Sequence, residues 1–455
     1  CLPAAVGAMD QKHKRQESPM KFTSRPPNQR WGFQRVATAD GSALGLYGTP
    51  RQSIRTLGFV CVVVMLVAIP MTIRAQELSE DGFATPNSVE GTLAATADRQ
   101  SAGGLEGFQA WKKEIEGRTG LSFGIDNQIQ YLGTNSDKTP SYAASNVFRF
   151  YGTWTATGRG TPNDGALVFK VENRSAIGSD ISTQALGPSL GYAGLFSTTF
   201  SDAGWVLTNF YWRQRLLNDR LSFVIGQVDV TDYVDVNNLS NPWTGFTNQA
   251  FEQLPTFPAP SQGLGAALQW RLNEQWAVLG GFADANADAA DPAGSAQGFF
   301  ETGETFKHFA VGWSPDWDDR FDQAVQLTLW QVDDRETAGV EGGQGVAFAA
   351  STRVGQWRPF LRAGYADGGG TFLDRAISVG TGYDARGGQD VAGIGFNWGR
   401  APDNSRDQST VEAFYRYGPN DFLQITPEIQ YVANPANDPA TGDILVLGLR
   451  LRVAF

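Results

Sequence analysis

Charged side chains that could bind a polar molecule recur at every second position in several segments of the chain. In one such segment Lys170, Glu172 and Arg174 alternate with the apolar Phe169 and Val171. A guanidinium group presents a planar set of donors and a carboxylate supplies acceptors, so this pattern can hydrogen-bond an uncharged, hydroxyl-rich ligand without covalent chemistry. The candidate residues that share this alternation are Arg149, Lys170, Glu172, Arg174, Arg213, Arg215, Arg362, Glu412, Arg416, Arg450 and Arg452.

Residues for covalent or metal chemistry are scarce. The two cysteines are Cys1 and Cys61, and the two histidines are His13 and His308. If the first 75 residues are removed on export, His308 alone remains, which argues against a Cys-based zinc site and leaves little for a Ser-His or Cys-His nucleophile. We expect no catalytic residue, no metal and no cofactor.

The elements that carry the charged residues are predicted to be β-strands with one apolar face. From Leu121 to Tyr131 apolar and polar residues alternate strictly, and comparable alternation recurs through the rest of the chain. Side chains on a strand point to opposite faces in turn, so the pattern indicates apolar residues facing lipid and polar residues facing a lumen. We count about fifteen clear strands and two uncertain ones, near residues 189–200 and 376–383, and predict an even total of sixteen.

The final segment shows the most regular alternation. Leucine or valine occupies every odd position from 445 to 453, the chain ends on Phe455, and Arg450 and Arg452 lie on the other face. A terminal strand that ends in Phe resembles the assembly signal of outer-membrane barrels, so Phe455 is expected to be that signal. The fold class predicted is therefore all-β, a transmembrane antiparallel barrel over residues 118–455, with a soluble β-sandwich or propeller as the alternative. Composition agrees with a barrel: 53 of 455 residues are glycine, 12% are aromatic and 18% are charged.

Export is indicated by residues 51–75. Arg51 and Arg55 precede an uncharged apolar run from Leu57 to Thr72, and Ala75 follows. A basic region, an apolar region and a small residue make a signal peptide, although an uncleaved anchor is the alternative. We expect the mature protein to begin near Gln76.

Three further segments precede the barrel or belong to its start. Residues 1–50 are basic and rich in Pro and Gln, and are predicted to be an upstream extension without a fold. Residues 76–117 are predicted to be a flexible N-terminus with one short amphipathic helix, marked by Phe108, Trp111 and Ile115, whose apolar side packs at the barrel mouth. The first 75 residues hold 10 of the 36 Lys and Arg and 3 of the 47 Asp and Glu, so the remainder carries a net charge of −18, which argues against nucleic-acid binding.

Two blocks of sequence resemble the carbohydrate-selective porins of the OprB family. One runs from Gly226-Gln227-Val228-Asp229 through Asp232-Tyr233-Val234-Asp235, Asn237-Asn238 and Phe246-Thr247-Asn248 to Gln262-Gly263-Leu264-Gly265. The other contains Glu412, Tyr415-Arg416, Thr426-Pro427-Glu428-Ile429-Gln430-Tyr431, Asn434-Pro435 and Gly448-Leu449-Arg450. The resemblance, which extends over most of residues 105–455, implies a sixteen-stranded barrel with a narrow, charge-lined pore for monosaccharides. Gly226 breaks the alternation, which indicates a bulge or an inward turn that carries Asp229 and Asp235 towards the pore.

These observations together predict a bacterial outer-membrane porin for passive diffusion of small neutral sugars. Arginines are expected to donate to sugar hydroxyls and to be held by Glu172 and Glu412, while Tyr151 and Tyr211 could stack on a sugar ring. Conductance is expected to be low, without strong cation preference, and loss of Arg174 or Arg416 to widen the pore. The expected partners are neutral carbohydrates, outer-membrane lipid and lipopolysaccharide, the barrel assembly machinery and, as an open possibility, further copies of the chain. A general porin, a channel for another solute and an outer-membrane enzyme are the alternatives.

Overall fold

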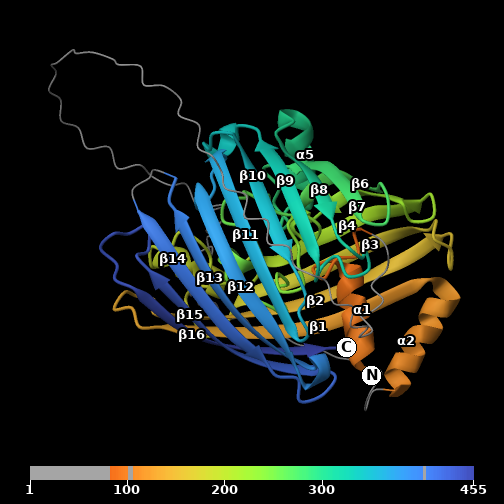
Figure 1. The fold of residues 1–455 in the computed structure, drawn as a ribbon, viewed down its shortest axis with the longest axis horizontal. Helices are drawn as coiled ribbons and strands as arrows, with labels where there is room; N and C mark the ends of the chain where they lie inside the picture. The colour runs from red at the N-terminus through yellow and green to blue at the C-terminus, as the bar shows by residue number, and fades with distance from the viewer. Residues whose placement is uncertain (1–81, 101–105, 403–405) are drawn as a thin grey trace, which may run out of the picture. The chain divides into compact units, whose positions relative to one another are not determined.

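A closed barrel of sixteen antiparallel strands dominates the computed structural model, which describes residues 82–100, 106–402 and 406–455 (Figure 1). Each strand pairs with its neighbours in the chain, and β1 pairs with β16 to close the ring. The strands are β1 (Leu121–Thr134), β2 (Tyr142–Thr157), β3 (Gly165–Ala176), β4 (Gly204–Leu216), β5 (Leu221–Val228), β6 (Gly263–Arg271), β7 (Trp276–Asp284), β8 (Thr305–Trp313), β9 (Ala324–Val332), β10 (Gly343–Ser351), β11 (Trp357–Gly368), β12 (Arg375–Ala385), β13 (Asp390–Arg400), β14 (Asp407–Arg416), β15 (Leu423–Ala433) and β16 (Ile444–Ala454).

The predicted fold class and strand number are confirmed, with one correction among the uncertain segments. Residues 376–383 lie in β12, whereas residues 189–200 form no strand and belong to a loop that folds over buried Leu190, Phe196 and Phe200. This loop was mistaken for a strand because it is apolar, and it is apolar because it packs inside the lumen.

The helices of the described residues are short, and they belong to the loops and to the segment before β1. None of those in the described residues is long and apolar enough to span a membrane. They are α1 (Val89–Gln100), α2 (Glu106–Thr119), α3 (Thr183–Ser189), α4 (Gln249–Glu252), α5 (Pro292–Thr302) and the 3-10 turns η1 (Val230–Asp232), η2 (Glu336–Ala338) and η3 (Arg386–Gly388).

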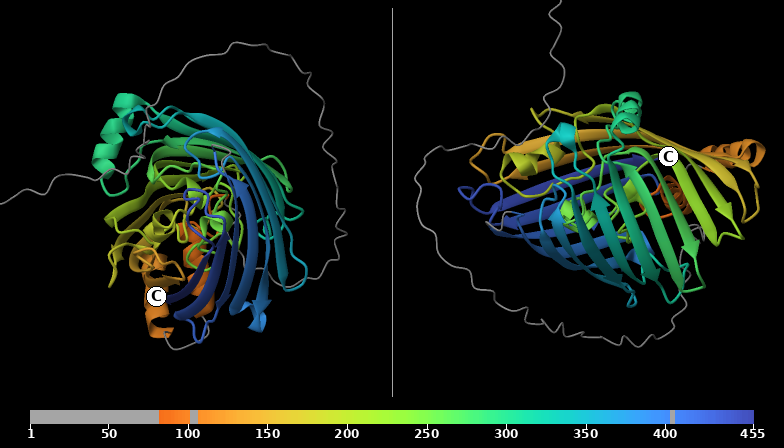
Figure 2. Two further views of the ribbon diagram at one scale, coloured as in Figure 1. Left: turned by 90° about the vertical axis from the view of Figure 1, so that its left-hand side faces the viewer. Right: turned by 90° about the horizontal axis from the view of Figure 1, so that it is seen from above.

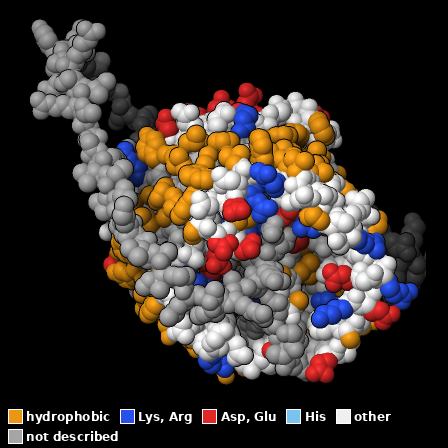
Figure 3. Space-filling view, turned by 45° about the vertical axis from the view of Figure 1, so that its right-hand side comes forward, with side chains coloured by type: hydrophobic (Ala, Val, Ile, Leu, Met, Phe, Trp, Pro, Cys, Tyr) orange, Lys and Arg blue, Asp and Glu red, His pale blue; other side chains and the backbone are white. Residues whose placement is uncertain are grey.

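The outer face of the barrel is apolar and the inner face is polar, as the alternation predicts. Hydrophobic side chains cover the outside (orange in Figure 3), whereas charged residues such as Arg149, Glu172 and Arg362 are buried inside. Exposed aromatic residues lie near both ends of the strands, which is the arrangement of the two interfacial girdles of a membrane barrel. They include Trp154, Trp270, Trp276, Trp357, Tyr415 and Tyr417 at the end with short turns, and Tyr131, Tyr142, Trp205, Phe282, Tyr365 and Tyr431 at the other.

The two N-terminal helices lie on different sides of the wall. The predicted amphipathic helix is α2, and it packs on the outer face of the barrel. The ring of Trp111 lies 5.9 Å from the ring of outward-facing Phe123, and Lys112 Nζ lies 5.5 Å from that Phe123 ring. Residues 82–97, by contrast, contain many buried side chains, although the sequence indicated a flexible segment there. The predicted signal peptide and upstream extension lie outside the described residues.

Phe455 completes the seam between the first and last strands. Its N–H donates to the carbonyl of Ile125 (2.8 Å), its carbonyl accepts from the N–H of Ile125 (3.1 Å), and its ring stacks on Phe422 at 6.1 Å. Deleting Phe455 is expected to lower the yield of folded barrel markedly, because both the closing hydrogen bonds and the predicted assembly signal are lost. The measurement is heat-modifiable mobility on gels, with Phe455→Tyr as the control that keeps the ring. Wild-type yield in the deletion variant would contradict this role.

Candidate functional site

The lumen is occupied by the loop between β5 and β6, here called the inward loop (residues 229–262). It crosses the interior of the barrel (green in Figure 2). Of the two alternatives predicted at Gly226, a bulge or an inward turn, the bulge is absent, because the pairing register is unbroken where Gly226 pairs with Tyr211 and Gly265. Its φ of 139° nevertheless departs from regular strand backbone. The predicted inward turn is found three residues later, where Asp229 caps η1 by accepting the Thr231 N–H at 3.0 Å.

Aromatic packing holds the middle of the inward loop against the wall. Phe246 contacts Phe251 of the same loop at a ring distance of 5.0 Å, and it meets Phe414 of β14 at 5.0 Å and Phe360 of β11 at 5.8 Å. All four rings are buried. Since a lumen wall would otherwise face water, this cluster shows that the loop is a packed part of the barrel interior.

The inward loop and the wall have complementary charges. The loop contains four carboxylates and neither Lys nor Arg, whereas the wall facing the lumen supplies most of the basic residues predicted from the alternation. The loop carboxylates are Asp229, Asp232, Asp235 and Glu252. Burial, opposed by Arg362 but reinforced by the neighbouring loop aspartates, raises the pKa of Glu252 to about 8.

Arg362 of β11 joins two parts of the loop. Its guanidinium forms an ion pair with the carboxylate of Asp235 and also donates to the carbonyls of Asp235 (2.8 Å) and Phe251 (2.7 Å). Asp235 adopts a left-handed backbone with φ of 59°, so the chain turns sharply at the point that Arg362 holds. Arg362 is fully buried, and its donors are used in binding the loop.

A second clamp comes from β14, β15 and β16. Arg450 donates to the carbonyls of Pro242 (2.9 Å) and Gly245 (2.8 Å) and pairs with Glu428 (2.8 Å). Glu412 accepts the backbone N–H groups of Thr247 (3.0 Å) and Asn248 (2.9 Å). These groups therefore satisfy loop backbone atoms that water would otherwise solvate.

Lys170 and Arg149 hold the two flanks of the loop. Lys170 Nζ lies 3.7 Å from Asp232, whose pKa is raised to about 7 because burial outweighs this cation. Arg149 places its guanidinium 3.8 Å from the ring of Trp243, a cation–π contact. The same guanidinium forms an ion pair with Asp126 of β1, and Asp126 also accepts from Arg452 of β16 at 2.7 Å. Asp126 thereby links the two strands that close the barrel.

The remaining predicted wall residues pair with each other or with neighbouring turns. Arg174 lies 2.6 Å from Glu172, and Arg213 contacts Asp164 at 3.2 Å and Glu90 at 2.9 Å. Tyr151 and Tyr211, expected to face a sugar, are buried in an apolar cluster instead.

A water-accessible cavity of about 700 Å³ lies next to the inward loop, here called the vestibule cavity. Its lining includes turns that connect β8 to β9, β10 to β11, β12 to β13 and β14 to β15, so it lies at the end of the barrel with short turns, the periplasmic end by the general rule for such barrels. Its charged lining comprises Asp318, Asp319, Asp322, Asp384 and Asp421 with Arg353, Arg358, Arg416 and Arg452.

Four of these charges form a compact network. Arg353 bridges Asp322 (2.8 Å) and Asp384 (2.9 Å), and Arg358 pairs with Asp384 at 2.7 Å. Asn238, Asn241 and Trp243 of the inward loop line the same cavity. The lining therefore offers alternating donors and acceptors with almost balanced charge.

Of the candidate residues predicted from the alternation, Arg416 and Arg452 line this cavity. Arg174, which was expected to act like Arg416, is not part of the lining. Sequence reasoning missed Arg353, Arg358, Asp322 and Asp384. Arg358 could have been found, because it has the same strand parity as Arg362, whereas Arg353 and Asp322 lie in turns, where alternation gives no signal.

His308 does not form part of a catalytic arrangement among the described residues. It is buried between the rings of Tyr233 (5.8 Å) and Phe306 (6.2 Å), and neither of its ring nitrogens has a hydrogen-bond partner there. A histidine that activates a nucleophile needs a hydrogen bond to that nucleophile and usually a second one that orients its ring.

A sixteen-stranded barrel with an apolar outer band, aromatic girdles and a loop folded into its lumen defines a porin of the bacterial outer membrane. The model of the family described as "Carbohydrate-selective porin, OprB family" matches residues 153–353 and 314–455. The chain therefore belongs to the OprB family of carbohydrate-selective porins, which confirms the resemblance read from the two sequence blocks.

One solved structure supports the fold, and two more are reported as similar chains. The high-pH structure of Pseudomonas putida OprB is 15% identical, with a TM-score of 0.62, and the match covers 77% of this chain and 97% of that one. Its low-pH structure is also 15% identical, with a TM-score of 0.47 and coverage of 78% and 98%. A loop L8 deletion mutant of the Vibrio cholerae outer membrane protein OmpT is 14% identical, with a TM-score of 0.48 and coverage of 74% and 99%. No curated protein sequence matches the chain.

Proposed function

We propose that this porin passes sugars of monosaccharide size by passive diffusion, and that the vestibule cavity is part of their path. The observation that carries the proposal is the lining of that cavity, where four arginines and five aspartates alternate beside amide and aromatic side chains of the inward loop. A sugar has many hydroxyls and no charge, so it gains hydrogen bonds from such a wall without needing a net field.

The wall arginines named from the sequence divide into two roles in this proposal. Arg362 and Arg450 fix the inward loop, and Arg416 and Arg452 face the cavity. Arg416 also donates to the carbonyl of Thr244 at 3.0 Å, so it connects the loop with the path. The selectivity of the pore then depends on the position of the loop as well as on the charges beside the sugar.

Near-balanced charge supports a channel with weak ion selectivity. The chain after residue 75 is strongly acidic, but charges on outer loops are screened within about 10 Å at 0.1 M salt. The lining charges, five acidic and four basic, are close enough to a permeating ion to determine its selectivity. The fold and family favour a channel over an enzyme.

Liposome swelling tests the sugar assignment. Purified protein in liposomes is expected to give fast swelling with glucose-sized monosaccharides, slower swelling with disaccharides, and slow swelling with charged amino acids of similar mass. Protein-free liposomes are the control for leakage. Equal rates for monosaccharides and for amino acids would contradict the proposal and favour a general diffusion porin.

The surroundings of the barrel are also part of the proposal. Its apolar band and girdles fit outer-membrane lipid and lipopolysaccharide, and its terminal Phe455 fits recognition by the barrel assembly machinery. Assembly into homo-oligomers is a further possibility that crosslinking in intact membranes would test.

A further inference from the structure

The segment before the barrel, here called the N-terminal strap (residues 82–100), lies in contact with the inward loop and the inner wall. Its start is fixed by local hydrogen bonds. Ser88 Oγ accepts the N–H of Gly91 at 3.1 Å and donates to the carbonyl of Thr85 at 2.9 Å. This is the hydrogen bonding of an N-cap, and it begins α1 at Val89.

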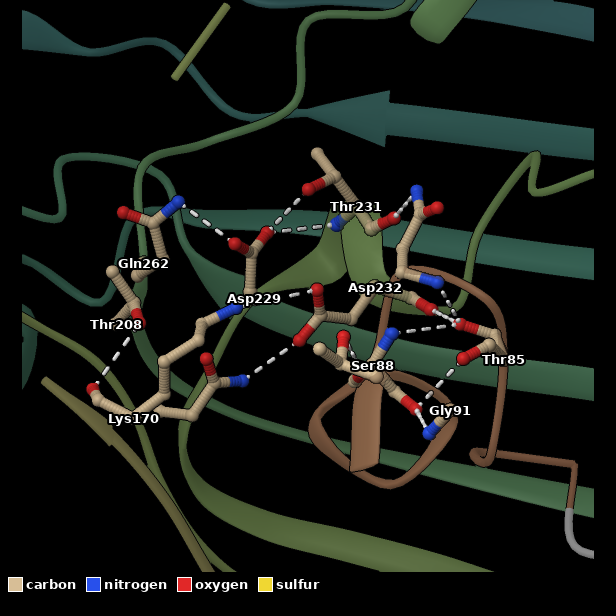
Figure 4. Close-up of polar contacts among 12 residues, drawn as sticks. Thr85, Ser88, Gly91, Lys170, Thr208, Asp229, Thr231, Asp232 and Gln262 are labelled. Atoms are coloured by element: carbon tan, nitrogen blue, oxygen red, sulfur yellow. Dashed lines mark hydrogen bonds and ion pairs between the residues drawn. The ribbon is translucent and has the colours of Figure 1, made fainter. Parts of the chain in front are cut away.

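Polar contacts join the strap to the inward loop (Figure 4). The hydroxyl of Thr85 donates to the carbonyl of Asp232, and Asn87 Nδ2 donates to the carbonyl of Thr231 at 3.2 Å. From the loop side, Asn241 Nδ2 donates to the carbonyl of Pro86. The strap thus binds both the first turn and the middle of the inward loop.

Contacts with the wall fix the other side of the strap. Glu90 Oε1 lies 2.9 Å from Arg213 Nη1 of β4, and both side chains are largely buried. Phe83 packs edge-on against Tyr233 at a ring distance of 5.3 Å. Phe83 and Val89 belong to one buried apolar cluster with wall residues Tyr151, Val168, Tyr211 and Val224.

The strap lies between packed interior and open space. The apolar cluster that contains Phe83 and Val89 extends along the inner wall from β2 to β12, whereas the vestibule cavity lies at the end of the barrel with short turns, beside the turns and strands from β8 onward. Pro86, Gly91, Thr92, Ala95 and Thr96 of the strap form part of the cavity lining. The strap therefore packs against the apolar interior with Phe83 and Val89 and forms part of the cavity wall with its other residues.

We propose that the N-terminal strap is a selectivity element of this porin, which sets the width of the permeation path and so its size limit for solutes. The strap precedes residues 153–455, where the family model matches. The statement about sugars rests on the proposed function, whereas the statement about path width does not.

Deleting residues 82–100 from the full chain tests the proposal. Single-channel conductance in KCl is expected to rise at least about twofold, and swelling with disaccharides to approach that with monosaccharides, because one wall of the path is lost. A deletion of α5 (Pro292–Thr302), which lies outside the cavity lining, is the control and should leave both values unchanged. Unchanged conductance in the strap deletion would overturn the proposal.

Cysteine modification gives an independent test with a milder change. Ala95 and Ala97 are both exposed residues of α1, but only Ala95 is among the cavity-lining residues. A bulky methanethiosulfonate reagent should lower the conductance of Ala95→Cys by about a fifth or more and leave Ala97→Cys unchanged. If mass spectrometry shows full labelling at both positions and neither conductance changes, the strap does not line the path, even where the deletion variant fails to fold.

The two measurements separate this inference from the proposed function. Raised conductance without any sugar selectivity in the wild type would leave the strap proposal intact and contradict the sugar assignment. Sugar selectivity in the wild type, combined with a conductance that neither the strap deletion nor the Ala95 label changes, would support the sugar assignment and contradict the strap proposal.

Discussion

Replacing Arg362 with alanine is expected to release the inward loop and to raise single-channel conductance several-fold, with increased current noise. Arg362 is buried, pairs with the Asp235 carboxylate and donates to the carbonyls of Asp235 and Phe251, so its loss removes the cation beside a buried carboxylate and the side-chain donor to two carbonyls. Breaking a buried ion pair from one side costs on the order of 3–5 kcal/mol, enough to favour detachment of a loop over retention of an unpaired charge. Planar-bilayer recording is the measurement.

Limited proteolysis reports on the loop itself. The inward loop has no Lys or Arg but several aromatic residues, so chymotrypsin should cut it in Arg362→Ala and spare it in the wild type. Arg362→Lys keeps the charge but not the fork of donors and should be intermediate. Arg375→Ala, at the end with long loops where the side chain is half exposed, is the matched control. A protected loop and wild-type conductance in Arg362→Ala would show that the clamp is dispensable.

The double substitution Arg353→Gln and Arg358→Gln is expected to make the channel strongly cation-selective and to slow sugar permeation. The cavity lining would keep five aspartates and only two arginines, and Asp322 and Asp384 would lose their cationic partners. The net charge of the lining would thus change from −1 to −3. Opposite unit charges at 4 Å attract by about 4 kcal/mol at an effective dielectric constant of 20, so cations in the path would be favoured strongly over anions. Glutamine is chosen because it keeps hydrogen-bond donors.

Reversal potentials in a KCl gradient measure this effect, and swelling rates on the same protein measure the sugar path. Arg375→Gln, which removes one positive charge at the other end of the barrel, is the control. Unchanged reversal potential would indicate that the vestibule cavity lies off the path of the ions.

The barrel could be predicted from the sequence because its pattern is local. A lipid-facing strand must place an apolar residue at every second position, so each strand from 121–131 to 445–455 carries its own signal. The lumen-facing position of Arg149, Arg362 and Arg450 follows from the same parity. The partners of these arginines in the inward loop could not be predicted in the same way. The loop lies up to about 200 residues away along the chain, and alternation contains no information on such distant contacts.

The N-terminal strap illustrates the opposite case. Residues 82–97 are small and polar and have no periodicity, because their environment is a lumen with a packed wall on one side and water on the other. Small residues such as Gly91 fit where space is limited: a Cβ there would lie 1.9 Å from the carbonyl oxygen of Thr85. Such a segment has the composition of a flexible tail although it is packed.

The ion network at Asp126 has a consequence for the order in which the molecule can assemble. Its carboxylate binds Arg149 from the adjacent strand and Arg452 from the far end of the chain, so only half of its partners are present until β16 arrives. The strap and the inward loop lie inside the ring that β16 closes, and they must be in place before or during this step. Closure of the seam is thus coupled to completion of the lumen, and an intermediate that lacks β16 has an open edge together with a carboxylate that has lost one of its two cations.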